Sequence, residues 1–310
     1  MCLIEQGAAG AVGELSDILQ RLEPSLGPVG REPAALEGGI TNRNYRVLLG
    51  EGEYVIRLHG KDTDLLGISR RAERLANDTA AGLGIAPAVV AEFDGGLVTE
   101  FLTCQALAGP DLEARAEELG EALRAFHESG VELPTRFWVP DLLSDYTRII
   151  RARGAALPGV YEQAMDIAGR ITLALGDGDL LRPCHNDLLA GNIVLDRTSD
   201  RVMLVDWEYA GMGHPWFDLG NLSVNNDFLQ ATDNRLLRAY LGKSPTEAQT
   251  ATLNLMRVLS DVREGAWGVM QSEVSELEFD FDGYAAEHFD RMRSAAAGPE
   301  FDRWLSAVEG

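Results

Sequence analysis

The sequence is poor in cysteine and has no long apolar run. Cys2, Cys104 and Cys184 are odd in number and far apart, so they indicate neither a disulfide framework nor the paired CxxC spacing of a zinc site. Residues 1–17 lack the basic n-region of a signal peptide. No stretch approaches the ~20 apolar residues that a membrane-spanning helix requires. These absences predict a cytoplasmic protein with no stable membrane insertion.

Basic residues are also scarce relative to acidic ones. The chain has 27 Lys and Arg against 49 Asp and Glu, a formal net charge of -22. Such a charge repels nucleic acids and anionic membrane surfaces and attracts small cations, although solubility alone also accounts for an acidic surface. We therefore expect no nucleic-acid partner. The composition carries no prediction of an oligomeric state.

The periodicity of the chain changes after its first hundred residues. A helix at 14–24, ended by Pro24 and Pro28, comes before a hairpin at 44–58, a helix at 68–84 and two strands at 86–102. Later segments have helical period, except for a strand pair within 182–209; the helical segments are 111–129, 156–178, 217–240 and 245–296. The pattern predicts an α+β protein with a small β-rich N-terminal part and a larger, mostly helical C-terminal part.

Polar residues cluster inside the strand pair at 182–209. The pattern His185-x-Asp187-x4-Asn192 has the spacing of a kinase catalytic loop, in which the Asp meets the acceptor hydroxyl and the Asn holds a metal ion. Asp206 follows the second strand, where another metal-binding carboxylate is needed. The three residues predict phosphoryl transfer assisted by Mg²⁺. The histidine of this pattern is expected to hold the loop rather than to act as a base.

The N-terminal part offers matching nucleotide-binding features. A kinase-like lobe needs a cation on its third strand and an acid on the next helix, and Arg57 and Glu73 stand at these places. The preceding loop, EGGITNRN, would supply backbone N–H groups to phosphates; its candidates are Gly39, Thr41 and Asn42. By analogy, the segment 98–102, which contains Glu100, fits a hinge that contacts adenine.

These segments together resemble one family. GGITNRNY, VIRLHG, CHNDLLAGN, LVDWEYAG and HPWFDLGN occur in the order found in the choline/ethanolamine kinase family, over about residues 34–291. That family has the kinase-like fold shared with aminoglycoside phosphotransferases. The resemblance implies a bilobal protein-kinase-like fold, with a nucleotide-binding lobe at 1–102 and a catalytic and substrate-binding lobe at 103–310.

The resemblance also implies roles for single residues. Asp187 becomes the catalytic base and a contact of the acceptor, with Asn192 and Asp206 as Mg²⁺ ligands. Glu208 is expected near the second metal ion or the substrate. Arg57, paired with Glu73, is expected on the phosphates of ATP, and Asp218 is expected to tether the catalytic loop.

A substrate ammonium is recognised by ring faces and acids, because a quaternary ammonium donates no conventional hydrogen bond. Trp267 and Tyr284 match aromatic positions of the family, and Tyr209 is a further candidate. Trp216 and Phe228 are open alternatives. Glu264 stands where the animal enzymes have a second Trp, which favours a primary or partly methylated ammonium, since such a group donates hydrogen bonds.

Three hypotheses follow. The first is an ATP- and Mg²⁺-dependent kinase that phosphorylates the hydroxyl of choline, ethanolamine or a methylated ethanolamine. The second is a kinase of the same fold acting on an aminoglycoside or another cationic hydroxyl metabolite. The third is a non-catalytic nucleotide-binding scaffold, against which the joint presence of Asp187, Asn192 and Asp206 argues.

Overall fold

A computed structural model describes residues 12–36, 42–60, 67–176, 180–275 and 277–309. The chain divides into two compact units, each assembled from separate segments. Unit 1 comprises Met1–Ile68, Asn77–Leu107 and Ala190–Trp207, and unit 2 comprises Ser69–Ala76, Ala108–Leu189 and Glu208–Gly310. Each unit combines stretches from different parts of the chain, so this division cannot be compared with a single lobe boundary at residues 102 and 103. That boundary stays a prediction.

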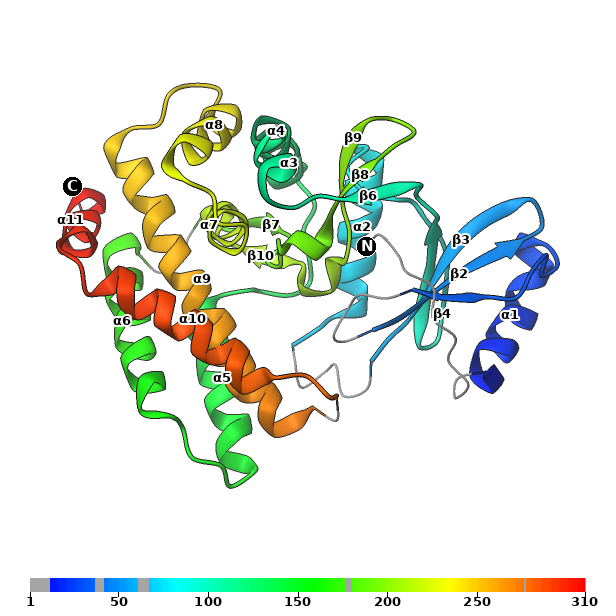
Figure 1. Ribbon diagram of the computed structural model, residues 1–310, viewed down its shortest axis with the longest axis horizontal. Coiled ribbons are helices and arrows are strands. Elements are labelled where there is room, and N and C mark those ends of the chain that lie inside the picture. Colours follow the sequence, from blue (N-terminus) through cyan, green and yellow to red (C-terminus); the bar gives the residue numbers. More distant parts are fainter. Residues whose placement is uncertain (1–11, 37–41, 61–66, 177–179, 276, 310) are drawn as a thin grey trace. The chain divides into compact units, whose positions relative to one another are not determined.

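Unit 1 is built on antiparallel sheets (Figure 1). A five-stranded sheet has the order β1-β2-β3-β5-β4, and a three-stranded sheet has the order β6-β8-β9. The strands are β1 (Ala34–Leu36), β2 (Arg43–Leu49), β3 (Gly52–Leu58), β4 (Val89–Phe93), β5 (Gly96–Glu100), β6 (Cys104–Ala106), β8 (Ile193–Asp196) and β9 (Arg201–Leu204). The hairpin, the later strand pair and the two strands between them are confirmed.

The core of unit 1 lies between helix α1 (Val12–Leu26) and the larger sheet. Leu15, Ile18, Leu19 and Leu22 recur at helical spacing and form one apolar face, which packs with buried residues of β2, β3 and β5. Of the two expected stops, Pro24 was wrong, because the helix continues through it to Leu26, two residues before Pro28. A proline this close to a helix end removes only one backbone hydrogen bond from the last turn.

Unit 2 is mostly helical, with one two-stranded sheet of β7 (Arg182–Cys184) and β10 (Gly211–Gly213). Its helices are α3 (Gly109–Glu113), α4 (Ala116–His127), α5 (Val139–Ala152), α6 (Gly159–Leu175), α7 (Pro215–Asn225), α8 (Gln230–Leu241), α9 (Glu247–Val274), α10 (Phe281–Ala296) and α11 (Pro299–Val308). Helix α2 (Arg70–Gly82) begins in unit 2 and ends in unit 1. The segment expected as one helix at 111–129 is divided between α3 and α4.

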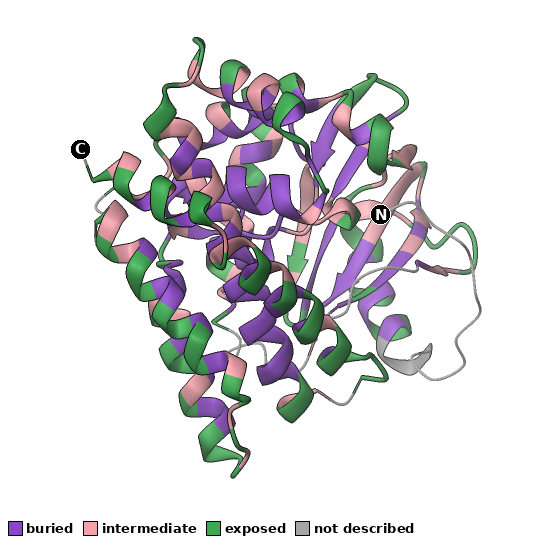
Figure 2. Cartoon of the chain, turned by 60° about the vertical axis from the view of Figure 1, so that its left-hand side comes forward, coloured by how far each residue is buried: buried purple, intermediate pink, exposed green. Residues whose placement is uncertain are grey.

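Helix α9 is the centre of unit 2 and contacts α5, α6, α7, α10 and α11. Its N-terminus has a capping box in which the Thr246 side chain and Gln249 satisfy each other's backbone N–H groups. Gly265 and Gly268 allow α10 to approach closely: a Cβ atom at Gly265 would lie 2.6 Å from the Phe289 ring. Figure 2 shows that the helices carry their buried residues on their inward faces and their exposed residues on their outer faces.

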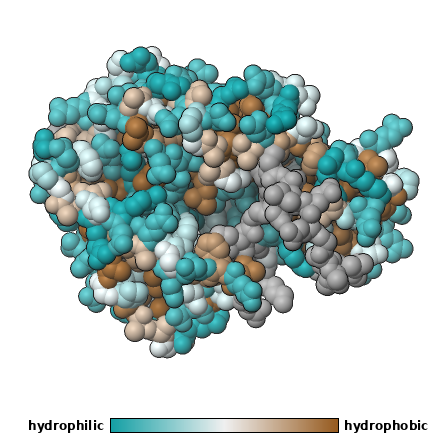
Figure 3. All heavy atoms as spheres, in the orientation of Figure 1, coloured by the Kyte–Doolittle hydropathy of each residue, from teal (hydrophilic) through white to brown (hydrophobic). Residues whose placement is uncertain are grey.

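The face of the molecule seen in Figure 3 is mostly polar. Figure 3 shows mainly hydrophilic residues, with apolar residues in small scattered groups. None of the helices in the described part of the chain is both long and apolar enough to cross a membrane. The cytoplasmic location stays a prediction.

Candidate active site

The loop that carries Asp187 follows β7 in unit 2 and is held by its backbone. The N–H groups of His185 and Asn186 donate to the two carboxylate oxygens of Asp218, over 2.8 and 2.7 Å. Asn186 has a φ of 67°, a left-handed conformation that few residues other than glycine adopt. Its side chain amide donates to the carbonyl oxygen of Tyr209 over 3.0 Å. These contacts fix the backbone on the N-terminal side of Asp187.

Asp218 is fully buried in the first turn of α7, and its tethering role is confirmed. A carboxylate that accepts two backbone N–H groups satisfies donors that would otherwise be buried without partners. The Nε2 atom of His127 lies 2.9 Å from the same carboxylate, and Nδ1 of His127 lies 2.9 Å from the Tyr240 hydroxyl. Asp218 and its partner His127 thus join the loop of Asp187 to helices α4 and α8.

Asn221 of α7 and Asn226, the residue that follows this helix, hold the C-terminal side of the loop. The N–H of Leu188 donates to Asn221 Oδ1 over 2.6 Å, and Asn226 Nδ2 donates to the Leu188 carbonyl over 3.0 Å. The loop is therefore bound on both sides of Asp187 by side chains of one helix. Asp187 itself is 8% exposed, and the expected hold of His185 on the loop is seen in the Asp187 N–H, which donates to His185 Nδ1 over 3.3 Å.

Asn192 and Asp206 belong to unit 1, where the β8–β9 hairpin brings them together. Ile193 pairs with Leu204, and the Val205 N–H donates to the Asn192 carbonyl over 3.0 Å. Both candidate ligands therefore stand at one end of the hairpin, next to its last paired residues. Asp206 has a φ of 67°, and its carboxylate accepts a hydrogen bond from Arg57 Nη2. An amide oxygen and a carboxylate at one position suit a hard cation such as Mg²⁺.

Glu73 is 1% exposed on α2 and forms an ion pair with Arg70 of the same helix, with Nη1 and Oε2 2.7 Å apart. Arg70 Nη1 also lies 3.5 Å from Glu208 Oε2, so it links Glu208 to α2. The expected pair of Arg57 and Glu73 would join residues of the two units and stays a prediction.

Of the remaining nucleotide candidates, Asn42 is buried and accepts from the Gly60 N–H over 3.3 Å. Glu100 is exposed at the end of β5, where it pairs with Tyr54 of β3. Gly39 and Thr41 lie outside the described residues. The nucleotide-binding roles of these four residues stay predictions.

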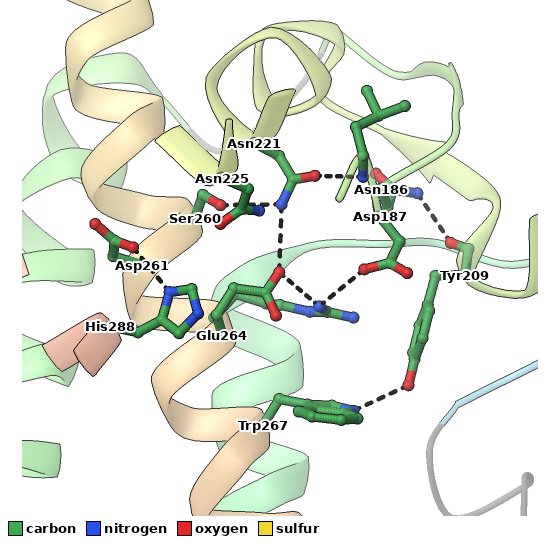
Figure 4. Close-up of polar contacts among 12 residues, drawn as sticks. Asn186, Asp187, Tyr209, Asn221, Asn225, Ser260, Asp261, Glu264, Trp267 and His288 are labelled. Carbon is green, nitrogen blue, oxygen red and sulfur yellow. Dashed lines mark hydrogen bonds and ion pairs between the residues drawn. The ribbon is translucent and has the colours of Figure 1, made fainter. Parts of the chain in front are cut away.

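Aromatic side chains gather beside the catalytic loop in unit 2 (Figure 4). Trp267 Nε1 donates to the Tyr209 hydroxyl over 2.9 Å, and the Trp267 and Tyr284 rings meet edge to face with centroids 5.7 Å apart. Burial and the nearby Glu208 charge raise the pKa of Tyr209 well above its usual value, so its hydroxyl stays protonated. The three candidate pocket residues thus form one cluster.

The two alternative pocket aromatics lie elsewhere in the packing. Trp216 contacts the Tyr240 ring edge to face, with centroids 6.4 Å apart. Phe228 is 1% exposed. Among the ring contacts of the described residues, none joins Trp216 or Phe228 to Tyr209, Trp267 or Tyr284.

Glu264 changes the expectation drawn from its position. Its carboxylate accepts hydrogen bonds from Arg263 Nη1, the Tyr284 hydroxyl and Asn221 Nδ2, over 2.8, 2.8 and 3.3 Å. Burial alone would raise the pKa of Glu264, but the neighbouring Arg263 charge holds it below its usual value. With three donors already bound and 1% of its surface exposed, Glu264 is not the free carboxylate that a primary ammonium would need.

The sequence did not indicate Arg263, Asn221 or Arg70 as parts of the site. Arg70 stands three residues before Glu73 on a helix, a spacing that favours an ion pair, so this contact had a detectable signal. Arg263 is 1% exposed on α9, and nothing in the local sequence connects it with a loop more than seventy residues earlier.

Comparison with known proteins shows the family of the chain. Residues 33–253 match the model of the phosphotransferase enzyme family. The chain is 31% identical to a choline/ethanolamine kinase family protein from Mesorhizobium loti, whose structure superposes with a TM-score of 0.81 over 95% of this chain and 99% of that one.

Two curated relatives from eukaryotes are also similar. Probable choline kinase 1 of Arabidopsis thaliana is 24% identical, over 90% of this chain and 92% of its own. Ethanolamine kinase 1 of Mus musculus is 26% identical, over 90% of this chain and 87% of its own. The expected α+β, protein-kinase-like fold is confirmed, and the chain belongs to the phosphotransferase enzyme family and, within it, to the choline/ethanolamine kinase family.

Proposed function

We propose that this protein is an ATP-dependent phosphotransferase that acts on the hydroxyl of a small amino alcohol: choline, ethanolamine or a methylated ethanolamine. Membership of the choline/ethanolamine kinase family supports the reaction class. The observation that carries the proposal is the neighbourhood of Asp187 in unit 2, where a rigidly bound loop lies beside the cluster of Tyr209, Trp267 and Tyr284. One carboxylate for a hydroxyl and several rings for an ammonium match the two ends of an amino alcohol.

The reaction we infer is direct in-line transfer without a phosphorylated enzyme. Asp187 orients the acceptor hydroxyl and accepts its proton, while the hydroxyl oxygen forms a bond to the γ-phosphorus of ATP. The bond between that phosphorus and the β–γ bridging oxygen breaks, and ADP leaves with the electron pair. Phosphoryl transfer of this kind depends mainly on positioning and on charge stabilisation, which is consistent with a loop bound on both sides of its aspartate.

The oxygen donors at the hairpin end support a role for Mg²⁺. Asn192 and Asp206 would hold the ion, with Glu208 as a further candidate ligand. A bound Mg²⁺ would neutralise negative charge on the phosphates. Arg57, which contacts Asp206, brings a cation to the same position and suits phosphate oxygens. The roles of these four residues are part of the proposal.

The acceptor end is aromatic rather than acidic. Because Glu264 is bound by three donors, it gives no reason to prefer a primary ammonium over a quaternary one. Cation–π contacts with Trp and Tyr rings stabilise both kinds of ammonium. Choline and ethanolamine therefore stand equally as acceptors.

A substrate panel tests the proposal. ADP release by the purified protein with Mg²⁺ and ATP is measured for choline, the mono- and dimethylated ethanolamines, ethanolamine and kanamycin, with a no-acceptor control. We expect turnover of at least one amino alcohol well above the control. Phosphorylation of kanamycin with none of the amino alcohols would replace the proposal by the aminoglycoside alternative. ATP binding without any turnover would favour a nucleotide-binding scaffold.

A further inference from the structure

Arg263 places a buried positive charge directly beside the proposed catalytic base. Its side chain is 2% exposed, and Nη1 lies 3.6 Å from Asp187 Oδ1. This distance is longer than a hydrogen bond, so the attraction is electrostatic. The guanidinium carbon also lies 4.6 Å from the centre of the Tyr209 ring and 5.7 Å from that of Phe137, so two ring contacts hold the guanidinium in place.

The same guanidinium belongs to a closed circuit of polar groups (Figure 4). Arg263 Nη1 donates to Glu264 over 2.8 Å, and Asn221 Nδ2 donates to the same Glu264 oxygen over 3.3 Å. Asn221 Oδ1 then accepts the N–H of Leu188, the residue next to Asp187. These polar groups therefore act on Asp187 at two places. Arg263 lies beside its carboxylate, and Asn221 binds the backbone N–H of the next residue, Leu188.

Stability alone does not account for this arrangement. A buried ion pair is usually no more stabilising than apolar side chains of the same volume, because both charges lose their hydration. Arg263 has a further cost, since its Nε and Nη2 atoms are buried without a hydrogen-bond partner in the described chain. A charge that is expensive to bury and lies next to the reacting carboxylate suggests a part in the reaction.

We propose that Arg263, held by Glu264, is a positioning residue that orients the Asp187 carboxylate toward the acceptor hydroxyl. The residues on both sides of Asp187 are held through hydrogen bonds to their backbone N–H groups, and Arg263 lies beside the Asp187 carboxylate itself. The fixed charge of Arg263 favours one orientation of the carboxylate. The inference rests on the proposed function, because it takes Asp187 as the base of that reaction.

A second consequence concerns the pocket. The guanidinium of Arg263 lies over the Tyr209 ring, which the sequence had indicated as a ring for the ammonium of the substrate. That face of the Tyr209 ring is therefore already in contact with a cation.

The test is the paired substitution Arg263→Met with Glu264→Gln, which removes both buried charges together. We expect kcat for the best acceptor of the panel to fall roughly 10- to 100-fold, the loss typical of a misplaced reacting group. The KM for ATP should stay within about twofold of wild type, since the circuit lies on the acceptor side of the reaction. A purely structural role would instead lower thermal stability and leave the kcat of the folded fraction unchanged.

A control ion pair joins α9, the helix of Arg263 and Glu264, to α10. Asp261, one turn before Glu264 on α9, binds Arg291 of α10, and within the described chain Arg291 contacts Asp261, His288 and Asn225 rather than Asp187. Asp261→Asn with Arg291→Met removes an ion pair of the same chemistry that is less buried, since the Arg291 side chain is 29% exposed. We expect its kcat to stay within about twofold of wild type, whatever its thermal midpoint.

The outcomes separate the inference from the proposed function. A wild-type protein that phosphorylates no amino alcohol defeats the proposed function itself. The inference alone is overturned by a different set of results. In that set the wild type is active, Asp187→Ala is inactive, and the Arg263→Met/Glu264→Gln variant is folded and has wild-type kcat. If that pair does not fold, Arg263→Lys decides, because the shorter ammonium cannot reach both carboxylates: a reduced kcat at unchanged KM for ATP supports the inference, and a wild-type kcat overturns it.

Discussion

The proposed metal ligands and the proposed base are positioned by different kinds of interaction. Asn192 and Asp206, in unit 1, stand at the end of the β8–β9 hairpin, where the backbone pairing of Ile193 with Leu204 fixes them. Asp187, in unit 2, lies on a loop whose backbone is bound by the side chains of Asp218 and Asn221. A backbone ladder tolerates most side-chain changes, whereas a loop held by side chains depends on each of them. We therefore expect the two regions to respond differently to substitution.

The largest effects should come from the reacting groups, where both regions are equally sensitive. Asp187→Ala and Asp206→Ala should each lower kcat by roughly 100- to 10,000-fold, the range for loss of a general base or a comparable group. Asp206→Ala should also lose most of its dependence on Mg²⁺, because it removes a proposed ligand. Steady-state kinetics across a Mg²⁺ series, with thermal melts to confirm folding, measure both effects. Full activity of either variant would reject its assignment.

The next largest effect should come from the side chain that binds the catalytic loop. Asp218→Asn replaces one acceptor oxygen with an NH₂ group that faces a backbone N–H or His127. A buried carboxylate with three partners is costly to disrupt, so we expect a loss of about 3 kcal/mol in the free energy of unfolding. We also expect kcat to fall roughly 10- to 100-fold, since Asp187 loses its fixed position. Urea titration and kinetics of the folded protein separate the two losses.

A smaller effect is expected from acid at the start of α7. Burial, and then the charge of His127, lower the pKa of His214 from its usual value of 6.5 to about 4, and its neutral Nδ1 caps the helix by accepting the Trp216 N–H over 3.3 Å. The folded state therefore binds this proton less readily than the unfolded state. The contribution of neutral His214 to the free energy of unfolding is therefore complete above about pH 6.5 and is lost as the pH falls toward 4.

His214→Asn keeps a side-chain cap but removes the titration. The thermal midpoint of this variant should fall less steeply than that of the wild type between pH 6.5 and 4.5. Equal slopes in the two proteins would mean that other groups control the acid sensitivity of this region.

The smallest effect should come from a side chain in the hairpin. Asp196 accepts from the Thr198 and Ser199 N–H groups and the Ser199 hydroxyl, within the turn between β8 and β9. Asp196→Ala should cost about 1 kcal/mol of stability and leave kcat within about threefold of wild type, because backbone pairing still sets the position of Asn192 and Asp206. A loss of kcat as large as that of Asp218→Asn would contradict the proposed difference between the two regions.

Much of unit 1 could be predicted because its signals are local. The turn at Gly50–Gly52 and the β-rich runs around it indicated the β2–β3 hairpin, and the turn at 198–200 indicated β8 and β9. Helix α5 was missed, although Leu143, Tyr146 and Ile150 recur at helical spacing after Pro140. The break between α3 and α4 has no comparable signal in the sequence.

The sequence by itself determined the chemistry: the spacing of His185, Asp187 and Asn192, with Asp206 after a hairpin, indicated phosphoryl transfer, and the longer motifs indicated the family. Only the tertiary structure decided which side chains surround those residues. Arg263 and Glu264 are adjacent in sequence, yet their contacts with Asp187 and Asn221 depend on how α9 packs against α7. The physical reason is that hydrogen bonds and ion pairs are short-ranged, so the partner of a buried charge is set by packing rather than by distance along the chain.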